Sequence, residues 1–301
     1  MAQGSIIMQE KLVSIIIPTY NRKHVIEKAI DSCLNQTYKH IEIIVCDDHS
    51  TDGTREYIAN RAKEDERIKY CVTPDGKKGA NAARNTAIKM AKGEYLAFLD
   101  SDDYLTEESI ACRVEKFETN PNVGMVYGNV FCENGRRKIK WIYTDVSKEK
   151  VHQRKYLMQE LSLCQTDAIM VRTAVFEKTG LLIEEQKAWN DDWLCVSVGM
   201  RYPVLHSRKF VAVVRKSQES ITSDKWGCYS GCRILVNCYK KQIVRYASYG
   251  RYLLWQIRLF SLYCQAKERD LQLDSVKRKF WEILHVLTRK VIQPYFRNHF
   301  E

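Results

Sequence analysis

The sequence predicts an α/β fold: a doubly wound, mostly parallel sheet with a helical extension at its C-terminal end. Short apolar runs alternate with helical patterns through the first hundred residues, as is typical of strands buried on both faces of a parallel sheet. Beyond residue 215 the pattern is helical only. The charge changes there as well, since residues 225–301 contain 15 Lys and Arg but 5 Asp and Glu, or +10 of the total +11.

The first half contains four expected strands with helices between them. The apolar runs LVSIIIP, IEIIVC, IKYCVT and EYLAFLD predict strands at residues 12–18, 41–46, 68–73 and 94–100. Helices are expected at residues 25–34 and 81–93, the second with Gly93 as the residue just past its end. The turn DDHSTDGT would open a further helix, capped by Ser50 or Asp52. This alternation favours right-handed crossovers in a parallel sheet.

The second half is less regular. Residues 123–143 predict a hairpin with Asn134 and Gly135 as its two-residue turn. Strands are expected at residues 166–172 and 210–215, and a helix is expected to begin at Asp191 and to end before Pro203.

The composition of the 301 residues is that of a globular protein, and it excludes several classes. No run of about 18 uncharged apolar residues exists, so no transmembrane helix is expected. The first residues lack a basic region and a long apolar core, so a signal peptide is not expected either. We predict a short leader at 1–11, an α/β domain at 12–224 and a basic, aromatic-rich helical extension at 225–301.

The eleven cysteines form no C-x-x-C pair and fall mostly in predicted strands and helices. They are expected to pack as small hydrophobic residues and to stay reduced in a cytoplasmic protein. Cys228, Cys232 and Cys238 lack a fourth nearby ligand, so a zinc site is not favoured.

An acidic cluster follows the fourth strand in the stretch YLAFLDSDDYL. Asp100, Asp102 and Asp103 repel one another, which a solvated turn or a bound cation would relieve. In an extended segment Asp100 and Asp102 project together, and two carboxylates without nearby Cys or His suit Mg²⁺ or Mn²⁺. The simpler interpretation is an acidic turn that caps the helix expected to begin near Thr106.

The acidic cluster is one of five motifs that occur along the chain in this order: IIPTYNR, IVCDDHSTDGT, GKKGANAARNTAI, FLDSDDYL and WNDDW. Together they closely resemble the family-2 glycosyltransferases of the GT-A fold, the nucleotide-diphospho-sugar transferase type. The resemblance runs from about Val13 to about Thr222. It implies an enzyme that moves a sugar from a nucleotide-sugar to an acceptor hydroxyl with inversion, with Mg²⁺ or Mn²⁺ as cofactor.

The same resemblance implies a nucleotide-binding set formed by Pro18, Thr19, Tyr20, Asp48, Arg84, Asp100 and Ser101. Thr19 and Tyr20 would contact the nucleobase, and Asp48 would accept the imide N–H of uracil. A carboxylate can accept from a ring N–H and a tyrosine ring can stack on a base, so a UDP-linked donor is expected. Arg84 would lie near the nucleotide or its diphosphate. Asp102 would bind the metal, with Asp100 beside it as a second candidate ligand.

The acceptor side is expected around the pair Asp191 and Asp192. The family's general base lies in such an acidic pair at the start of a helix, so we nominate Asp192. Asp191 would cap the helix, where an anion is favoured, although both could do only that. Trp189 and Trp193 offer ring faces to an acceptor sugar, and core packing is the simpler interpretation of each.

Three positions depart from the family pattern. Ser217 stands where family members often carry a metal-binding His, and His206 lies before the last expected strand. Ala87 replaces the usual Gly after ARNT, and Asp191 is shorter than the usual Glu.

The expected role is surface polysaccharide or glycoconjugate synthesis on a glycan or lipid-linked saccharide acceptor. A non-catalytic nucleotide-sugar binding subunit is an alternative, as is a sugar nucleotidyltransferase, although PTYNRKH lacks the Gly-rich loop of that class. The basic extension has two interpretations. Its helices pack on the catalytic domain with solvated charges, or residues 225–301 rest on an anionic membrane at the inner face of the cytoplasmic membrane. No motif supports a nucleic-acid partner.

In the last helix of the extension one predicted face is apolar, formed by Val276, Phe280, Ile283, Leu284, Leu287 and Val291.

Overall fold

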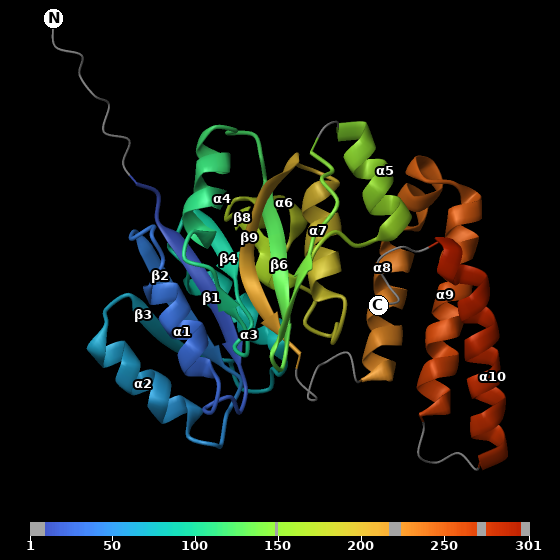
Figure 1. Ribbon diagram of the computed structural model, residues 1–301, viewed down its shortest axis with the longest axis horizontal. Helices are drawn as coiled ribbons and strands as arrows, with labels where there is room; N and C mark the ends of the chain where they lie inside the picture. Colours follow the sequence, from blue (N-terminus) through green and yellow to red (C-terminus); the bar gives the residue numbers. More distant parts are fainter. Residues whose placement is uncertain (1–9, 148–149, 217–223, 270–274, 296–301) are drawn as a thin grey trace, which may run out of the picture.

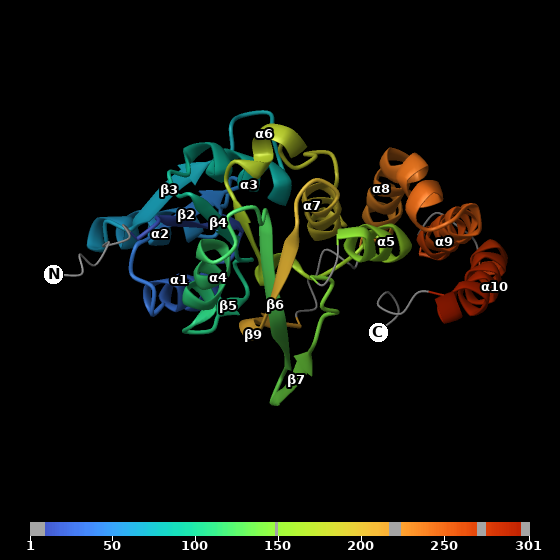
Figure 2. The same cartoon turned by 90° about the horizontal axis from the view of Figure 1, so that it is seen from above.

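A nine-stranded mixed sheet organises the molecule, with helices on both of its faces and a group of three helices at one side (Figure 1, Figure 2). The computed structural model describes residues 10–147, 150–216, 224–269 and 275–295. The strands are β1 Val13–Thr19, β2 Ile41–Asp47, β3 Ile68–Val72, β4 Tyr95–Phe98, β5 Tyr104–Leu105, β6 Met125–Asn134, β7 Arg137–Trp141, β8 Ile169–Arg172 and β9 Val204–Arg215.

The helices of the sheet domain are α1 Ile26–Leu34, α2 Thr54–Glu64, α3 Ala80–Met90, α4 Ser109–Glu118, α5 Lys150–Glu160, α6 Val175–Thr179 and α7 Asn190–Gly199. The C-terminal helices are α8 Lys225–Tyr246, α9 Tyr249–Glu268 and α10 Ser275–Ile292. Short 3₁₀ turns occupy Thr166–Ala168 and Gln293–Tyr295. The leader predicted at 1–11 falls almost entirely outside the described residues.

The sheet order is β3-β2-β1-β4-β8-β6-β9-β5, with β7 paired to β6. The half formed by β3, β2, β1 and β4 is parallel, as the alternation of strands and helices predicted. Every residue of β1 and of β2 is buried, which explains why both sequences are mainly apolar without alternation, and the buried Ser14 hydroxyl of β1 donates to the Glu42 carboxylate of β2. The other half mixes directions, since β8 runs antiparallel to β4 and β6 while β9 runs parallel to β6. The α/β class is confirmed, and the sheet is mixed.

Several local predictions were wrong by a few residues. The residue before α2 is Gly53 in the left-handed region, with φ of 87°, so neither Ser50 nor Asp52 is the N-cap. The Asp52 carboxylate still accepts the Thr54 N–H at 3.0 Å. Helix α7 is preceded by Trp189, also left-handed with φ of 65°, and Asp191 lies inside its first turn instead of capping it.

Gly93 does not end α3, because Ala91 is the residue that follows the helix. The glycine is needed for a close approach instead. A Cβ atom on Gly93 would lie 2.6 Å from the backbone nitrogen of Ser14 in β1, a distance that real Cβ atoms do not adopt.

The hairpin turn is displaced by one residue from the predicted one. Asn134 pairs with Arg137, so the two-residue loop consists of Gly135 and Arg136. Gly135 has φ of 58°, the left-handed conformation that such turns require.

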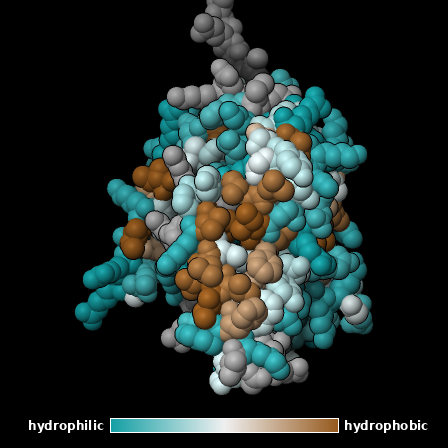
Figure 3. Space-filling view, turned by 90° about the vertical axis from the view of Figure 1, so that its right-hand side faces the viewer, coloured by the Kyte–Doolittle hydropathy of each residue, from teal (hydrophilic) through white to brown (hydrophobic). Residues whose placement is uncertain are grey.

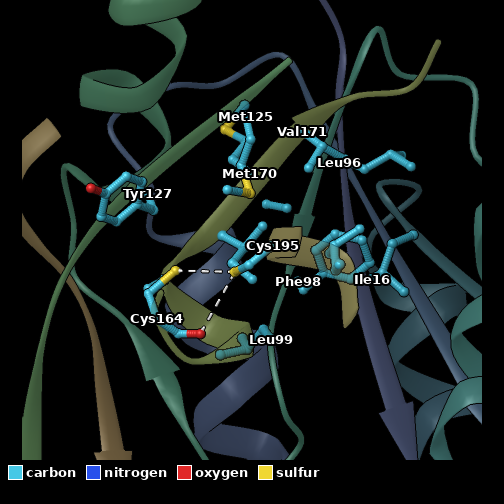
Figure 4. Close-up of a cluster of buried hydrophobic side chains, with 14 of the residues drawn as sticks. Ile16, Leu96, Phe98, Leu99, Met125, Tyr127, Cys164, Met170, Val171 and Cys195 are labelled. Carbon is cyan, nitrogen blue, oxygen red and sulfur yellow. Dashed lines mark hydrogen bonds between the residues drawn. The ribbon is translucent and has the colours of Figure 1, made fainter. Parts of the chain in front are cut away.

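The core beneath the second half of the sheet is filled by aliphatic, aromatic and sulfur-containing side chains (Figure 4). Cys164 and Cys195 lie there with their Sγ atoms 3.8 Å apart, as free thiols. Burial raises the pKa of the Cys164 thiol, so it packs as a neutral, apolar group. All eleven cysteines are free, as predicted.

The C-terminal helices stack outward from the sheet domain in the order α8, α9, α10 (Figure 2). Helix α8 lies directly on the chain that leads into α7: a Cβ atom on Gly231 would come within 2.3 Å of the Ala188 carbonyl oxygen. Trp255 of α9 is fully buried, with its ring edge-on to Trp189 at 6.2 Å. Within the described residues, no helix has the length and apolar character that crossing a bilayer requires.

Candidate active site

A cleft of about 770 Å³ opens where strands β1, β2, β4 and β9 end. Ligands bind parallel sheets at this edge because the loops that leave the strands diverge there. The cleft walls include the segment after β1, the turn after β4, the segment before α7 and the end of β9.

The end of the cleft near β1 and β2 combines an aromatic ring with a carboxylate. The Tyr20 side chain is 56% exposed on the cleft wall, so one face of its ring is available to a ligand. The Asp48 N–H donates to the Thr19 carbonyl at 2.8 Å, which fixes the two loops together. Asp48 Oδ2 accepts the Gly79 N–H at 2.7 Å, whereas Oδ1 is buried without a partner among the described residues. An unsatisfied buried acceptor beside an exposed ring fits an N–H on a flat heterocycle.

Asp47 has a structural role, unlike Asp48, which lines the cleft. Its side chain is fully buried and accepts the Ser50 N–H at 3.1 Å, so it shapes the turn after β2. Its side chain therefore faces into the protein and not into the cleft.

Arg84 of α3 reaches the middle of the cleft floor. Its Nη2 donates to Asp100 Oδ1 at 2.5 Å, and its Nη1 donates to Asn81 Oδ1 at 3.2 Å. The Arg84 side chain is only 4% exposed while that of Asp100 is 35% exposed. The ion pair therefore holds one side of Asp100 and leaves the rest of that carboxylate facing the cleft.

The acidic segment after β4 is a tight turn and not the extended segment expected, because the Asp103 N–H donates to the Asp100 carbonyl at 3.1 Å. The turn brings Asp100 and Asp103 together with Asp167, so that one oxygen from each lies within 4.8 Å of the others. Asp167 Oδ1 accepts the Asp100 N–H at 2.7 Å, and Asp103 Oδ1 accepts the Arg215 N–H at 2.7 Å. The two buried carboxyls thus fix the turn, and all four aspartates line the cleft.

Burial dominates the protonation of this cluster. It raises the pKa of Asp167 to about 7, with the Asp100 charge adding to the effect. It raises the pKa of Asp103 to about 11, with Asp167 and Asp100 as further causes. The pKa of Asp102 is also raised, first by burial and then by Asp100. A divalent cation would reverse these shifts, because it favours the charged carboxylates.

The donor chemistry of this turn fits a hard divalent ion. Carboxylate oxygens are the ligands that Mg²⁺ and Mn²⁺ prefer, and open positions facing a cleft leave room for phosphate oxygens. Asp100, Asp103 and Asp167 are the one group of three clustered His, Cys, Asp or Glu side chains in the described part of the chain. Asp102 is not a member of that group, but it lines the same cleft, so Asp102 and Asp100 would hold the ion with Asp103 and Asp167 close by.

The acidic pair of α7 is divided between two environments. Asp191 lies on the cleft wall, and Asp192 is not among the residues that line the cleft. Burial raises the pKa of Asp191 to about 6. The pKa of Asp192 is raised well above its ordinary value, by burial and then by the Asp191 charge, although a hydrogen bond from Ser162 opposes the shift.

Trp189 and Trp193 also lie in different environments. Trp189 lines the cleft, whereas the Trp193 ring packs against Tyr239 of α8 with centroids 5.8 Å apart. Trp189 is therefore the ring that an acceptor in the cleft would meet.

Most of the residues singled out from the sequence meet in this one cleft: Pro18, Thr19, Tyr20, Asp48, Arg84, Asp100, Ser101, Asp102, Trp189 and Asp191. Asp192 and Trp193 lie beside it. Ser217 lies outside the described residues. His206 belongs to β9, which begins earlier than predicted, and its Nε2 bonds to Asn129 Oδ1 at 3.0 Å.

Sequence reasoning missed the cations of the cleft, Arg22, Arg215 and Lys216. The charges of Arg22 and Arg215 both lower the pKa of Asp102, in opposition to burial, so they lie near the acidic turn. Arg215 Nε donates to the Asp102 carbonyl oxygen. These residues follow or end strands of the sheet, and their position at the carboxyl edge was the signal that could have identified them.

Comparisons with known proteins agree with this arrangement. A model of the family described as Glycosyl transferase family 2 matches residues 14–180. The chain is similar to the UDP-Glc:alpha-D-GlcNAc-diphosphoundecaprenol beta-1,3-glucosyltransferase WfgD of Escherichia coli, at 33% identity over 219 residues. That alignment covers 73% of this chain and 83% of the relative.

Two solved structures share the fold. TarS 1–349 of S. aureus in complex with UDP-GlcNAc aligns with a TM-score of 0.63 at 21% identity, over 96% of this chain and 93% of that one. The mannosyltransferase PcManGT from Pyrobaculum calidifontis, in complex with GDP-Man and Mn²⁺, aligns with a TM-score of 0.62 at 17% identity. This second alignment covers 96% of this chain and 85% of that one.

Proposed function

The chain belongs to glycosyl transferase family 2, and on that basis we propose that it transfers a sugar from a UDP-sugar to a lipid-linked saccharide with inversion, in surface glycan synthesis. The observation that carries the donor assignment is the buried Oδ1 of Asp48, which has no partner in the described part of the chain, beside the exposed ring of Tyr20. The imide N–H of uracil would satisfy that oxygen while the base stacks on the ring. The similarity to WfgD, whose name specifies a UDP-Glc donor and a diphosphoundecaprenol-linked acceptor, supports the substrate classes.

The diphosphate would occupy the middle of the cleft. Arg84, Arg215 and Lys216 line this part and supply positive charge for it. Asp102, with Asp100 beside it, would hold Mg²⁺ or Mn²⁺ there. When bound, such an ion neutralises charge that develops on the leaving diphosphate. The complex of PcManGT with Mn²⁺ supports this choice of metal.

The proton of the acceptor hydroxyl would pass to the acidic pair of α7. The sequence nominated Asp192, but Asp191 is the carboxylate on the cleft wall, and its pKa of about 6 leaves it ionised at neutral pH. Burial raises the pKa of Asp192 well above its ordinary value, and Asp192 is not among the residues that line the cleft. We therefore assign the base to Asp191 and keep Asp192 as the alternative. The ring of Trp189 would support the acceptor sugar.

The domain division and the location are part of the same proposal. Residues 12–224 would form the catalytic domain and residues 225–301 an extension, since β9 ends at Arg215 and α8 begins at Lys225. Eleven free cysteines support a reducing compartment such as the cytoplasm.

The proposal is tested by incubating the purified chain with UDP-glucose, Mn²⁺ and a synthetic GlcNAc-diphosphate lipid, and by measuring released UDP together with the glycosylated lipid. Acceptor-dependent UDP release with a β-linked product supports inverting transfer, because UDP-glucose is α-linked. UDP binding without UDP release from any donor would instead indicate the non-catalytic subunit.

A further inference from the structure

The outermost helix, α10, exposes to solvent most of the apolar face that the sequence predicted, although that face could have packed on the protein. Its inner side is formed by Trp281, His285 and Ile292. The Trp281 ring meets Tyr263 of α9 edge-on at 5.7 Å, His285 Nδ1 lies 3.1 Å from Ser261 Oγ, and Ile292 is fully buried. The helix therefore docks on α9 through a different side from its most apolar one.

The outward side is a stripe formed by Phe280, Ile283, Leu287 and Val291, which we call the α10 apolar stripe. These side chains are between 51% and 56% exposed. Their spacing of three, four and four residues places them along one line of the helix surface. Figure 3 shows the corresponding side of the molecule, where brown apolar residues gather in the centre with hydrophilic residues around them.

The charge around the stripe is almost entirely positive. Helix α10 contains Lys277, Arg278, Lys279, Arg289 and Lys290. Its one acid is Glu282, whose carboxylate pairs with Lys279 Nζ at 2.7 Å. At 100° per residue, Lys279 and Lys290 fall along one edge of the stripe and Lys277 along the other. All three are exposed.

We propose that the α10 apolar stripe docks on the surface of an anionic lipid bilayer, with the helix lying in the plane of the interface. An amphipathic helix with apolar residues on one side and Lys and Arg beside them binds such surfaces, because burial of the apolar residues and attraction to lipid phosphates add together. A second copy of the chain fits less well, since pairing two stripes face to face brings two strongly basic helices together. Crossing the bilayer is not part of the proposal.

The position of α10 permits this docking without closing the cleft. In Figures 1 and 2 the helix is the outermost element on the side away from the sheet. The cleft is lined by sheet-domain residues and by none from α8, α9 or α10. The inference stands apart from the proposed reaction, since it concerns lipid surfaces and not a substrate.

The test is flotation of the full chain with vesicles of phosphatidylglycerol and phosphatidylcholine, compared with vesicles of phosphatidylcholine alone. The variant Phe280→Glu with Leu287→Glu places two charges on the stripe. A matched control is Ile139→Glu with Ile142→Glu, because both isoleucines are exposed on the distant β7 hairpin and the charge change is identical. Circular dichroism checks that each variant is folded, and light scattering gives the mass of each.

The wild type and the β7 control should float with the anionic vesicles at low salt, and less in high salt or with phosphatidylcholine alone. The α10 variant should bind at least about tenfold more weakly. Wild-type chain that stays off the anionic vesicles overturns the proposal, as does an α10 variant that floats like the wild type. A wild-type dimer that stays off the vesicles, and that the α10 variant converts to a monomer, assigns the stripe to self-association instead.

Discussion

Arg84 and Asp100 form a hydrogen-bonded ion pair of 2.5 Å at the floor of the cleft, between a buried guanidinium and a carboxylate that is one-third exposed. The pair links α3 to the turn after β4, so the guanidinium is held in position without a bound ligand. Because the guanidinium also donates to Asn81, a lysine cannot replace both contacts.

We expect Arg84→Ala to weaken UDP binding and to lower the free energy of unfolding by about 1–3 kcal/mol, less than for a fully buried pair because Asp100 meets solvent. Titration calorimetry and urea unfolding measure the two effects. Arg61→Ala is the control, since Arg61 pairs at 2.7 Å with Asp31, neither residue lines the cleft, and the change should leave UDP affinity unaltered. Unchanged UDP affinity in Arg84→Ala would remove Arg84 from the donor site.

The uridine assignment depends on Asp48 and Tyr20. Asp48→Ala should weaken UDP binding about tenfold or more, because the imide N–H loses its acceptor. Tyr20→Ala should cost about 1–3 kcal/mol of binding, whereas Tyr20→Phe should keep the stacking and bind nearly as the wild type. Calorimetry with UDP and GDP measures these effects. A wild-type protein that binds GDP more tightly than UDP contradicts the assignment.

The assignment of Asp191 as the general base predicts how turnover changes with pH. Since the pKa of Asp191 is raised to about 6, turnover should rise with pH through about 6 as the carboxylate forms. Asp191→Asn should lower kcat by about 10²–10⁴ with little change in UDP affinity, since only a role in the transition state is lost. Asp192→Asn is the matched neighbour, and it should keep most of the activity. The reverse outcome, with Asp192→Asn inactive and Asp191→Asn active, returns the base to Asp192.

Sugar transfer should require a divalent metal ion that Asp102 helps to bind. Removal of divalent ions with EDTA should abolish transfer, and Mn²⁺ or Mg²⁺ should restore it. Asp102→Ala should remain inactive when metal is added, yet should fold at least as stably as the wild type because a carboxylate with a raised pKa has been removed. Product formation and thermal unfolding measure the two parts. Full activity in excess EDTA rules the metal out.

The buried carboxyls predict that stability without metal falls as pH rises. The folded pKa of Asp167 is about 7 and that of Asp103 about 11, both above their ordinary value. The folded protein therefore holds protons that the unfolded chain has released above about pH 4, so the free energy of unfolding decreases from that pH upward. Melting temperatures in EDTA at pH 5 and pH 8 measure this. Asp103→Asn should reduce the difference in melting temperature between pH 5 and pH 8. Its amide oxygen can still accept the Arg215 N–H.

The sequence predicted well which residues meet in the cleft next to β1, β2 and β4, because these residues follow the strand order. Residues 18–20, 48 and 100–102 come directly after buried apolar runs, and parallel strands end at a common edge. The same logic failed within the acidic turn, where a local hydrogen bond from Asp103 to Asp100 replaced the expected period of two. Asp167 could not be predicted, since its contact with Asp100 joins residues 67 positions apart.

The cleft wall formed by the segment before α7 was harder to predict. Adjacent helical residues face different directions, so Asp191 and Asp192 part at the start of α7. Trp189 precedes the helix in a left-handed conformation, so its ring does not follow the helical direction of Trp193. The sequence identified the segment, but only packing against α8 and α9 determines which side chain faces the cleft. In α10 the apolar pattern was evident, and the sequence left open whether it faces the protein or solvent.

The contact of Gly231 with Ala188 bears on how such enzymes can be recombined. A helix that approaches the segment before α7 closely enough to exclude a methyl group constrains that segment's shape, and with it the shape of the cleft wall. A chimera that exchanges the C-terminal helices while keeping the parental segment 186–193 would join two surfaces that were not shaped for each other. The natural unit of exchange is thus the segment and the helices together, and the join belongs upstream of residue 186.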